Sequence, residues 1–476
     1  MRQTRWLAIE TGPRGYDGIT ELTLAKGGMP DESVGCDRSG RNPIPRGSLE
    51  DRAVQASPRG SGTEIGRRLG WILVTDLADK KEGIGVDGLA GRHALSTAHL
   101  RHYHQRMVLK EVFSQPGVSQ AQLREATGLS RPTLATILER LVNQGFLIRD
   151  RTEVPRRGAP VGKYFLNDRT LRFLGIDVGP EGMFGQWMDS SGQRLESVQW
   201  SRQEILQACL DQAPLPWSGQ AMTAGAIAVP AMFDPRSEVL ERSTVFPELV
   251  GCGLREHAMA TTGRPFHYVH NAAAAALTEW EPGSEDFVVY MIVGTSVGVG
   301  YADHYGPAGL GPHHGEVAHL PVGSAGPLCP ICGRHGCLES WVGLPALARA
   351  VGMDQALPWN TPEGLYAVRA KLLACQGAWP PSVVPALDAL ATATEILTQV
   401  VGEVPIIVGG RIGEVLLEGV LERLSLRSAW LRPVVQPPRS APSERWRVAF
   451  GAALYARNRW LQAFPEDSGP SAEGAN

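Results

Sequence analysis

Long hydrophobic segments are missing from this sequence. No apolar run in its 476 residues approaches the roughly 20 residues that a bilayer-spanning helix needs. The N-terminus also lacks the basic and apolar regions of a secretory signal peptide. No internal repeat of fixed period is present, which excludes solenoid and propeller architectures. We therefore expect a cytoplasmic, non-repetitive protein with no membrane partner.

A strong charge of either sign is missing as well. The formal net charge is only −3, so the chain as a whole is not a polyanion binder, although a small basic module can still sit on a larger acidic domain. Cysteines are few: there are seven, and three of them crowd together at Cys329, Cys332 and Cys337. This clustering favours a metal site in a reducing compartment over a disulfide framework.

Residues 1–97 show no amphipathic periodicity and are rich in Gly, Arg, Pro and Asp. Such a composition is typical of disorder, and a start codon assigned too far upstream would produce it equally well. Only residues 71–76 suggest a short strand there. Beyond this segment the sequence predicts a helical domain over 98–168, a larger domain of alternating strands and helices over 169–460, and a polar tail over 461–476.

Two short helices separated by a glycine turn are predicted between residues 119 and 141. Ser119 is a suitable N-cap for the first helix, and Gly128 can end it in a left-handed conformation. Ser130 caps the second helix, and Pro132 lies in its first turn, where a missing N–H costs little. The buried stripe of that helix is expected to be Leu134, Ile137, Leu138 and Leu141. This is the pattern of a helix-turn-helix, whose second helix enters the DNA major groove by its N-terminal residues.

The exposed end of the second helix carries the candidate DNA contacts. Polar side chains there can reach base edges or phosphates, and they are Ser130, Arg131, Thr133 and Thr136. Residues 145–151 and 163–167 suggest a β-hairpin wing, whose tip presents Arg156 and Arg157 for a phosphate or minor-groove contact. An ordinary helical hairpin with a solvated charged face would share the helix–glycine–helix pattern. The ordered set of two capped helices and a basic wing favours double-stranded DNA as the partner.

A metal site is indicated by the cysteine cluster and one histidine. Structural zinc is held by four soft or borderline ligands in a tetrahedron. Cys329, Cys332 and Cys337 fall within nine residues, and His319 lies ten residues before the first of them. Four protein ligands leave no open coordination position, so we expect a structural rather than a catalytic Zn²⁺. Buried or free thiols are the alternative interpretation.

Several motifs follow one another in a recognisable order, namely Leu174–Gly179, Gly225–Pro230, Gly294–Gly300, Gly315–His319, Cys329–Glu339 and Ile407–Gly410. In this order they resemble the phosphate turns, sugar cleft and zinc signature of the ROK family (repressors, open reading frames, kinases). Together with the helix-turn-helix, they resemble its repressor branch over about residues 98–455. One departure concerns the metal: the family separates its first two cysteines by one residue, whereas two residues separate Cys329 from Cys332. Cys329 is therefore the ligand that the resemblance supports least.

The resemblance implies an α/β fold: an N-terminal winged helix-turn-helix followed by a two-lobed, actin-like domain of the ribonuclease-H type, as in sugar kinases. It also implies that Glu316, His319 and Glu339 hold sugar hydroxyls. Carboxylates accept pairs of hydroxyl hydrogen bonds, and a zinc-bound imidazole keeps its second nitrogen for a ligand. His270 and Asn271 are further candidates for a hydroxyl contact. Charged surface positions are the alternative interpretation of the three signature residues.

A kinase of this family needs a general base that takes the proton of the sugar hydroxyl. The family uses an Asp, and the matching segment here is His270–Ala276. Asn271 stands at the Asp position, and an alignment shifted by one residue would place Ala272 there instead. Neither side chain accepts a proton at neutral pH. We therefore expect a pseudo-kinase with no catalytic residue.

The phosphate turns are altered too. Pro180 removes an N–H from the first turn, and Glu181 adds negative charge where an anion would sit. In the second turn Ser296 stands where the family more often has Gly. On the sugar side, residues 243–247 and Cys252 occupy the stretch where the family carries an Asn and often a Trp. The changes in the phosphate turns add to the expected loss of kinase activity. Those on the sugar side indicate either weak binding or a ligand that differs from glucose-type sugars.

The sequence thus predicts a transcriptional regulator, by resemblance a repressor of carbohydrate genes, that responds to a sugar or sugar derivative. We expect a homodimer or homotetramer on a palindromic operator, because a symmetric dimer presents two DNA-binding domains. Two alternatives stay open. One is a regulator that has lost sugar sensing and responds to a protein partner, and the other is an active sugar kinase with an accessory DNA-binding domain.

Overall fold

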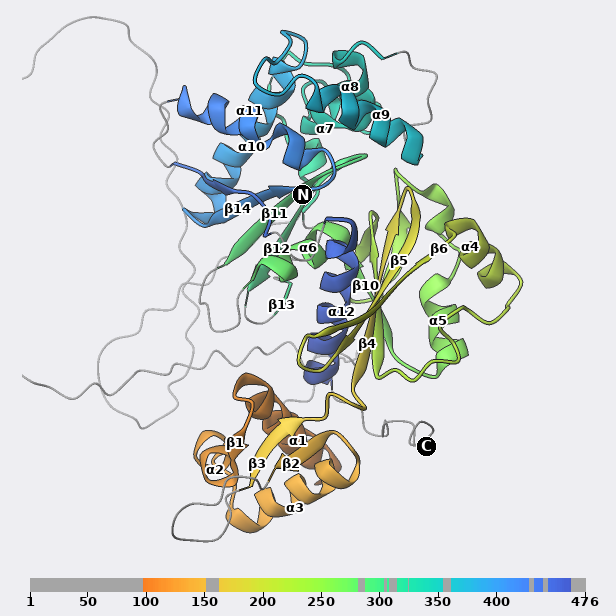
Figure 1. Ribbon diagram of the computed structural model, residues 1–476, viewed down its shortest axis with the longest axis vertical. Helices are drawn as coiled ribbons and strands as arrows, with labels where there is room; N and C mark the ends of the chain where they lie inside the picture. The colour runs from red at the N-terminus through yellow and green to blue at the C-terminus, as the bar shows by residue number, and fades with distance from the viewer. Residues whose placement is uncertain are drawn as a thin grey trace, which may run out of the picture. The chain divides into compact units, whose positions relative to one another are not determined.

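The computed structural model describes residues 97–150, 162–280, 287–303, 306–307, 315–323, 325–353, 361–427, 432–439 and 444–463. The strand suggested at 71–76, the wing-tip residues Arg156 and Arg157, and positions 464–476 of the predicted polar tail lie outside these ranges. The described chain forms an N-terminal domain and two lobes, each lobe built on its own sheet (Figure 1).

The N-terminal domain contains three helices and a small sheet. Its elements are α1 (Thr97–Ser114), β1 (Val118–Ser119), α2 (Gln120–Thr127), α3 (Arg131–Asn143), β2 (Leu147–Asp150) and β3 (Lys163–Leu166). The strands lie in the order β1-β3-β2, and β2 pairs antiparallel with β3 as the hairpin of a wing. Both helix caps are confirmed: Ser119 forms a reciprocal capping box with Gln122, and Ser130 accepts from the backbone N–H of Thr133.

The glycine turn and the apolar stripe of this domain are confirmed as well. Gly128 ends α2 with a φ of 67°, the left-handed conformation that glycine adopts without a steric penalty. The predicted stripe of α3, residues 134, 137, 138 and 141, is buried throughout. These side chains pack with α1 residues such as Leu109 and Val112 into one core. The polar face of α3 is thereby left toward solvent.

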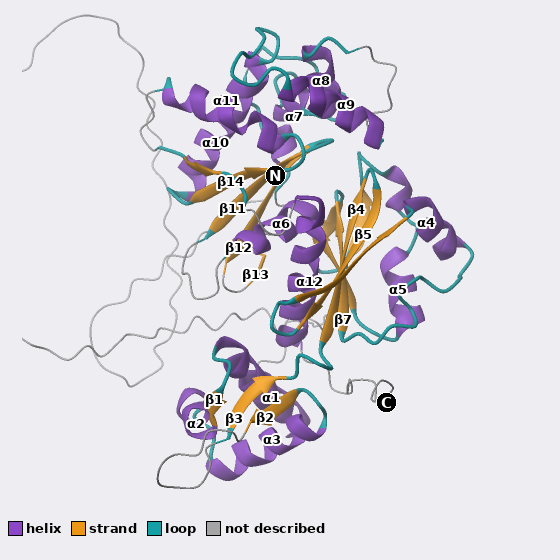
Figure 2. Ribbon diagram, in the orientation of Figure 1, coloured by secondary structure: helices purple, strands orange, loops and turns teal. Residues whose placement is uncertain are grey.

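The first lobe is a five-stranded mixed sheet in the order β10-β7-β4-β5-β6 (Figure 2). Its elements are β4 (Arg172–Gly179), β5 (Gly182–Asp189), β6 (Arg194–Trp200), α4 (Arg202–Leu210), β7 (Ala224–Val229), β8 (Met232–Asp234), β9 (Val239–Arg242), the 3-10 helix η1 (Pro247–Leu249), α5 (Leu254–Thr262) and β10 (Phe266–His270). β4 and β5 are buried along almost their whole length, because the sheet is covered on both faces.

The second lobe repeats the same strand pattern in the order β13-β12-β11-β14-β15. Its elements are β11 (Val288–Val293), β12 (Val297–Asp303), β13 (Gly306–Pro307), η2 (Val317–His319), α7 (Leu338–Val342), α8 (Leu344–Ala350), α9 (Pro362–Leu373), α10 (Val384–Val401), β14 (Pro405–Gly409), α11 (Gly413–Ser425) and β15 (Val434–Gln436). In each lobe an antiparallel hairpin is followed by strands that pair in parallel. Two sheets of one topology are the architecture expected of an actin-like, ribonuclease-H-type domain.

Two helices, α6 (Asn271–Glu279) and α12 (Glu444–Ala463), lie between the two sheets (Figure 1). Glycines allow them to approach very closely. A Cβ on Gly451 of α12 would lie 1.7 Å from the carbonyl oxygen of Ala274 in α6, and a Cβ on Gly175 of β4 would lie 2.0 Å from the carbonyl oxygen of Ala449. Arg447 of α12 and Glu279 of α6 form a buried ion pair in the same layer. These contacts fix α12 against both α6 and the first sheet.

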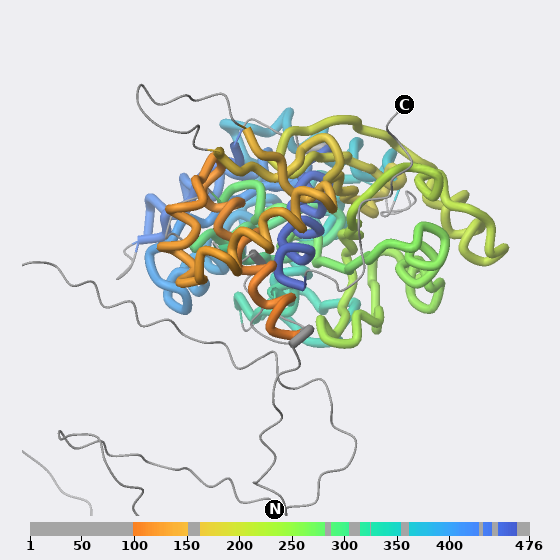
Figure 3. The backbone as a smooth tube through the Cα atoms, turned by 90° about the horizontal axis from the view of Figure 1, so that it is seen from below, coloured from red at the N-terminus to blue at the C-terminus, as the bar shows by residue number. Residues whose placement is uncertain are grey.

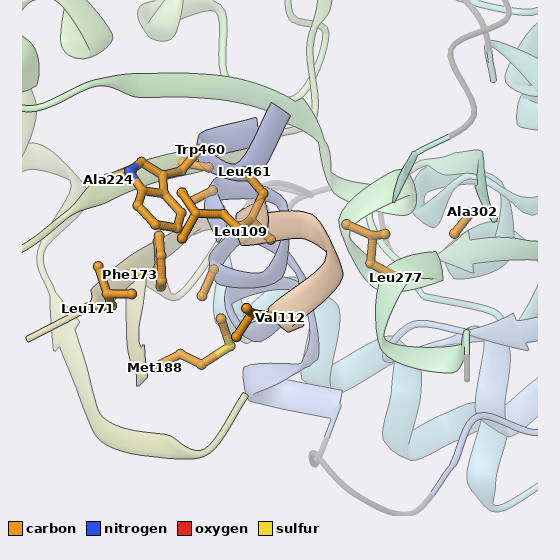
Figure 4. Packing of buried hydrophobic residues seen from close by; sticks show 14 of the residues in the cluster. Leu109, Val112, Leu171, Phe173, Met188, Ala224, Leu277, Ala302, Trp460 and Leu461 are labelled. Carbon is orange, nitrogen blue, oxygen red and sulfur yellow. The ribbon is translucent and has the colours of Figure 1, made fainter. Parts of the chain in front are cut away.

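The far end of α12 packs on the N-terminal domain. The Trp460 ring lies 5.7 Å from the ring of Phe146, which follows α3, and 5.8 Å from Phe173 in β4. Arg457 stacks on the Phe113 ring of α1 at 4.6 Å, and Arg106 of α1 donates to the carbonyl oxygen of residue 462 at 2.7 Å. One buried cluster therefore runs from the N-terminal domain through α12 into the lobes (Figure 4). The backbone trace shows the end of α12 beside the helices of the N-terminal domain (Figure 3).

Candidate functional site

The N-terminal end of α3 presents the predicted DNA-contacting residues on an exposed surface. Ser130, Arg131, Thr133 and Thr136 are all exposed. The hydroxyls of Ser130 and Thr133 lie 2.8 Å apart as part of the helix cap, and Thr136 donates to the carbonyl oxygen of Pro132 at 3.1 Å. Arg131 is the only cation in this set, and it lies next to the helix N-terminus, where phosphate binding is favoured. The structure thus places these four residues together in the exposed cap and first turns of α3.

A cleft of about 230 Å³ lies between the lobes. It is lined by the ends of β4, β7 and β11, by the start of α6 and by the segment around η2. Four of the five predicted sugar-binding residues are in its wall: Glu316, His319, His270 and Asn271. Thr244, from the altered stretch at 243–247, also lines it, as do Arg242 and Arg411, which the sequence did not single out. The cleft therefore collects side chains from motifs far apart in the chain.

Glu339 is the predicted sugar ligand that does not line the cleft. Its carboxylate instead accepts from the hydroxyl of Ser296 at 2.8 Å and from the backbone N–H of Val297 at 3.1 Å. Burial raises the pKa of Glu339 to about 7, although these two hydrogen bonds act in the opposite direction. The side chain therefore braces the turn between β11 and β12 beside the cleft.

The four predicted metal ligands come together at the edge of the cleft. The ligand atoms of His319, Cys329, Cys332 and Cys337 all lie within 4.8 Å of one another. The sulfur atoms of Cys332 and Cys337 are 3.4 Å apart, and that of Cys329 is 3.7 Å from Nδ1 of His319. A tetrahedron with Zn–S bonds near 2.3 Å requires S···S separations of about 3.8 Å. The donor set thus fits a closed, four-ligand metal site.

Cys329 belongs to this cluster despite the unusual spacing of the first two cysteines. Its side chain is fully buried, and its backbone N–H and carbonyl close the knuckle through hydrogen bonds with residues 334 and 333. Because Nδ1 of His319 faces the thiols, the other side of the ring is left for the cleft, which His319 also lines. Burial and the nearby charges of Arg334 and Arg242 hold the pKa of His319 below its usual value. The neutral imidazole that results is the form that binds metals.

The phosphate end of the cleft contains an ion pair that joins the lobes. Glu181, in the turn between β4 and β5, accepts from Nη2 of Arg411 at 3.0 Å and from the hydroxyl of Tyr366 on α9. Burial raises the pKa of Asp177, which lies beside this pair, to about 6, against the lowering effect of the Arg411 charge. Sequence reasoning noted Glu181 but missed Arg411 and Tyr366. The one available signal was that Arg411 directly follows the turn at Gly409 and Gly410.

Comparison with known proteins identifies the larger domain. The sequence profile of the ROK family matches residues 173–440, which is more than half of the chain. The chain belongs to the ROK family. Within the same chain, the profile of the MarR family matches residues 103–158, the region of the winged helix-turn-helix. This ROK protein therefore combines the two parts that its motifs predicted.

Curated relatives and a solved structure agree with this assignment. The xylose repressor of Bacillus subtilis (strain 168) is 22% identical over 266 residues, which cover 53% of this chain and 68% of that repressor. A putative xylose repressor of a Caldicellulosiruptor species is 24% identical over 279 residues, covering 54% and 67% of the two chains. A crystal structure of a ROK family transcriptional regulator, described as a homologue of the E. coli MLC protein, aligns with a TM-score of 0.57 and 16% identity. It covers 77% of this ROK chain and 98% of its own, and shows the shared fold. Among the described residues, no helix is long and apolar enough to cross a membrane.

Proposed function

We propose that this ROK protein is a DNA-binding transcriptional repressor of carbohydrate genes, controlled by a sugar or sugar derivative in the interlobe cleft. The observation that carries the proposal is the continuous core between the two functional parts. Helix α12 joins the domain that carries the exposed helix α3 to the cleft lined by hydroxyl-binding side chains. Val448 of α12 lines the cleft, and Trp460 of α12 packs on the N-terminal domain. The proteins of similar sequence that are named xylose repressors make a pentose a reasonable first ligand to test.

The site supports binding rather than phosphoryl transfer. Asn271 lines the cleft at the start of α6, and its side-chain oxygen accepts from the backbone N–H of Ala272 at 2.8 Å. An amide in that position cannot act as the general base. Of the acidic side chains in the described cleft wall, Asp177 belongs to the phosphate end and Glu316 to the sugar end. We therefore propose a pseudo-kinase that lacks the catalytic base, which leaves an active ROK sugar kinase as the less favoured alternative.

The His/Cys cluster is proposed to hold a structural zinc ion. A bound Zn²⁺ would supply a fixed positive centre that orders the loop between β12 and α7. The chain's own residues then do the recognition: His319 holds one ring edge toward the cleft, and Glu316 lies three residues before it. The carboxylate of Glu316 can accept hydrogen bonds from hydroxyl groups, and the second ring N–H of His319 can donate one to a hydroxyl oxygen. His319 and Glu316 would thus position a sugar ligand, and the metal would only hold the loop that carries the ligand residues.

A symmetric homo-oligomer on a palindromic operator completes the proposal. Two copies of α3 related by a two-fold axis would read two half-sites about one helical turn apart. A ligand that favours one arrangement of the lobes would change how the two copies of α3 fit those half-sites. A regulator that has lost sugar sensing and answers to a protein partner would keep the operator and lose only the ligand effect.

Arg131→Ala tests the DNA-recognition helix directly. Random duplexes are selected with the full chain, and the enriched duplex is then titrated by fluorescence anisotropy. We expect the variant to bind it at least about tenfold more weakly, because a base or phosphate contact is lost in every half-site. Arg236→Ala, an equal charge change at an exposed position after β8, should bind like the wild type. Unchanged affinity in Arg131→Ala would show that α3 does not read the operator.

A further inference from the structure

A turn that would hold nucleotide phosphates in a kinase of this fold is bonded in this protein to a turn on the nucleotide side of the other lobe. The first is the two-residue turn between β4 and β5, where Gly179 pairs with Gly182 and Glu181 is one of the two residues between them. The second is the turn after β14, where Gly410 has a φ of 89° and Arg411 follows it. The carboxylate of the first turn and the guanidinium of the second are 3.0 Å apart. This contact spans the cleft from the first lobe to the second.

Both sides of this contact are held firmly in place. Arg202 donates to the carbonyl oxygen of Gly179 at 2.6 Å, and the side chain of Gln199 donates to the backbone carbonyl of Glu181 at 2.9 Å. On the other side, Nε of Arg369 donates to the backbone carbonyl of Arg411 at 3.0 Å. A Cβ on Gly410 would lie 2.4 Å from the carbonyl oxygen of Val293, so the direction of this turn depends on glycine. The two charged side chains are therefore aimed at each other by fixed backbones.

The pair is sheltered from water. The side chain of Glu181 is 6% exposed and that of Arg411 is 19% exposed. Tyr366, from α9 of the second lobe, donates its hydroxyl to the second carboxylate oxygen of Glu181. Both carboxylate oxygens of Glu181 thus accept hydrogen bonds from residues of the opposite lobe. An arginine in a phosphate-binding wall ordinarily meets an anion, and here the protein supplies that anion itself.

We propose that Glu181, Arg411 and Tyr366 form an interlobe latch, in which the carboxylate of Glu181 takes the place of a nucleotide phosphate and joins the lobes without one. The inference rests on the proposed function, since a sensor that responds to one sugar benefits from a cleft whose other half is permanently filled. The latch excludes nucleotide from the phosphate end and leaves the end near His319 and Glu316 for the effector.

Glu181→Gln tests the latch, because it keeps the size of the side chain and removes its charge. Hydrogen–deuterium exchange of the full chain should rise at least about tenfold at two places, the turn between β4 and β5 and the turn between β14 and α11. Tyr366→Phe should give a smaller rise at the same two places. Glu395→Gln, which breaks an ion pair with Arg427 inside the second lobe, should change neither.

MgATP provides the second measurement. The melting temperatures of the wild type and of Glu395→Gln should be the same with and without millimolar MgATP. Glu181→Gln, in which Arg411 is released, should melt at a higher temperature with MgATP than without it. Exchange that rises only around residue 181 would overturn the interlobe bond. Increased exchange without an MgATP effect would overturn the role of Glu181 as a phosphate substitute. Neither measurement uses operator DNA or sugar, so loss of the proposed repressor function would leave the test of the latch intact.

Discussion

Cys337→Ser is expected to abolish stoichiometric zinc binding by this protein. Cys337 is almost fully buried, is the N-cap residue of α7 and pairs with Pro321 in an isolated bridge, so its backbone is fixed. Its sulfur lies 3.4 Å from that of Cys332 in the ligand cluster. Loss of one of four ligands typically lowers metal affinity by several orders of magnitude, because structural zinc contributes on the order of 10 kcal/mol to small sites. We expect close to one zinc per wild-type chain and close to none per variant chain, measured by plasma mass spectrometry after dialysis.

The loop, rather than the whole protein, should lose its structure in this variant. Both lobes keep large cores of their own, so far-ultraviolet circular dichroism should change little while the segment between residues 320 and 337 becomes rapidly exchanging. Because His319 lines the cleft, loss of the metal should also weaken the binding of a sugar there. Cys375→Ser removes a thiol outside the cluster and should keep its zinc. A Cys337→Ser protein with full zinc occupancy would contradict the four-ligand site.

Trp460→Ala is expected to separate ligand binding from operator release. The indole is 2% exposed and contacts Phe146 of the N-terminal domain and Phe173 of β4. Truncating a buried tryptophan to alanine costs roughly 3–5 kcal/mol, and here the lost contacts join the two functional parts. Denaturant titration should show this loss. The variant should still bind the selected duplex and still be stabilised by an active sugar, but the sugar should no longer change its affinity for DNA.

Trp460→Phe is the matched control, because it keeps an aromatic ring between the two domains (Figure 4). It should retain most of the sugar effect on operator affinity. A second control, Trp379→Ala, removes a partly buried tryptophan that packs in the core of the second lobe. It should lower the stability of the protein and leave the effect of sugar on operator affinity unchanged. If Trp460→Ala responded to sugar as the wild type does, α12 would not be the connection between cleft and DNA-binding domain.

Features with a local signature could be predicted from the sequence. The caps at Ser119 and Ser130, the left-handed Gly128 and the buried stripe of α3 depend on residues a few positions apart, where hydrogen-bond and steric preferences act directly. The ligand cluster at His319 and the three cysteines was predictable for the same reason, since its members fall within a short segment. The order of the glycine motifs then identified the two lobes.

Features that depend on distant pairs could not be predicted. Glu181 and Arg411 are 230 positions apart, and nothing in the periodicity of either segment indicates that they meet. The contacts of Glu339 could not be predicted for a related reason, because the donors that hold its carboxylate, Ser296 and the backbone of Val297, lie more than 40 positions away. The packing of Trp460 on the N-terminal domain likewise depends on residues far apart in the sequence. An amphipathic pattern shows which face is buried, not what covers it.

We propose that a sugar in the cleft controls DNA binding by α3. The most direct measurement is the equilibrium affinity of the full chain for its selected duplex, with and without D-xylose, followed by a panel of other pentoses, hexoses and amino sugars. We expect at least one sugar to weaken operator binding about tenfold or more and to raise the melting temperature of the free protein. Tight operator binding that no sugar alters, with no sugar changing the melting temperature, would contradict it.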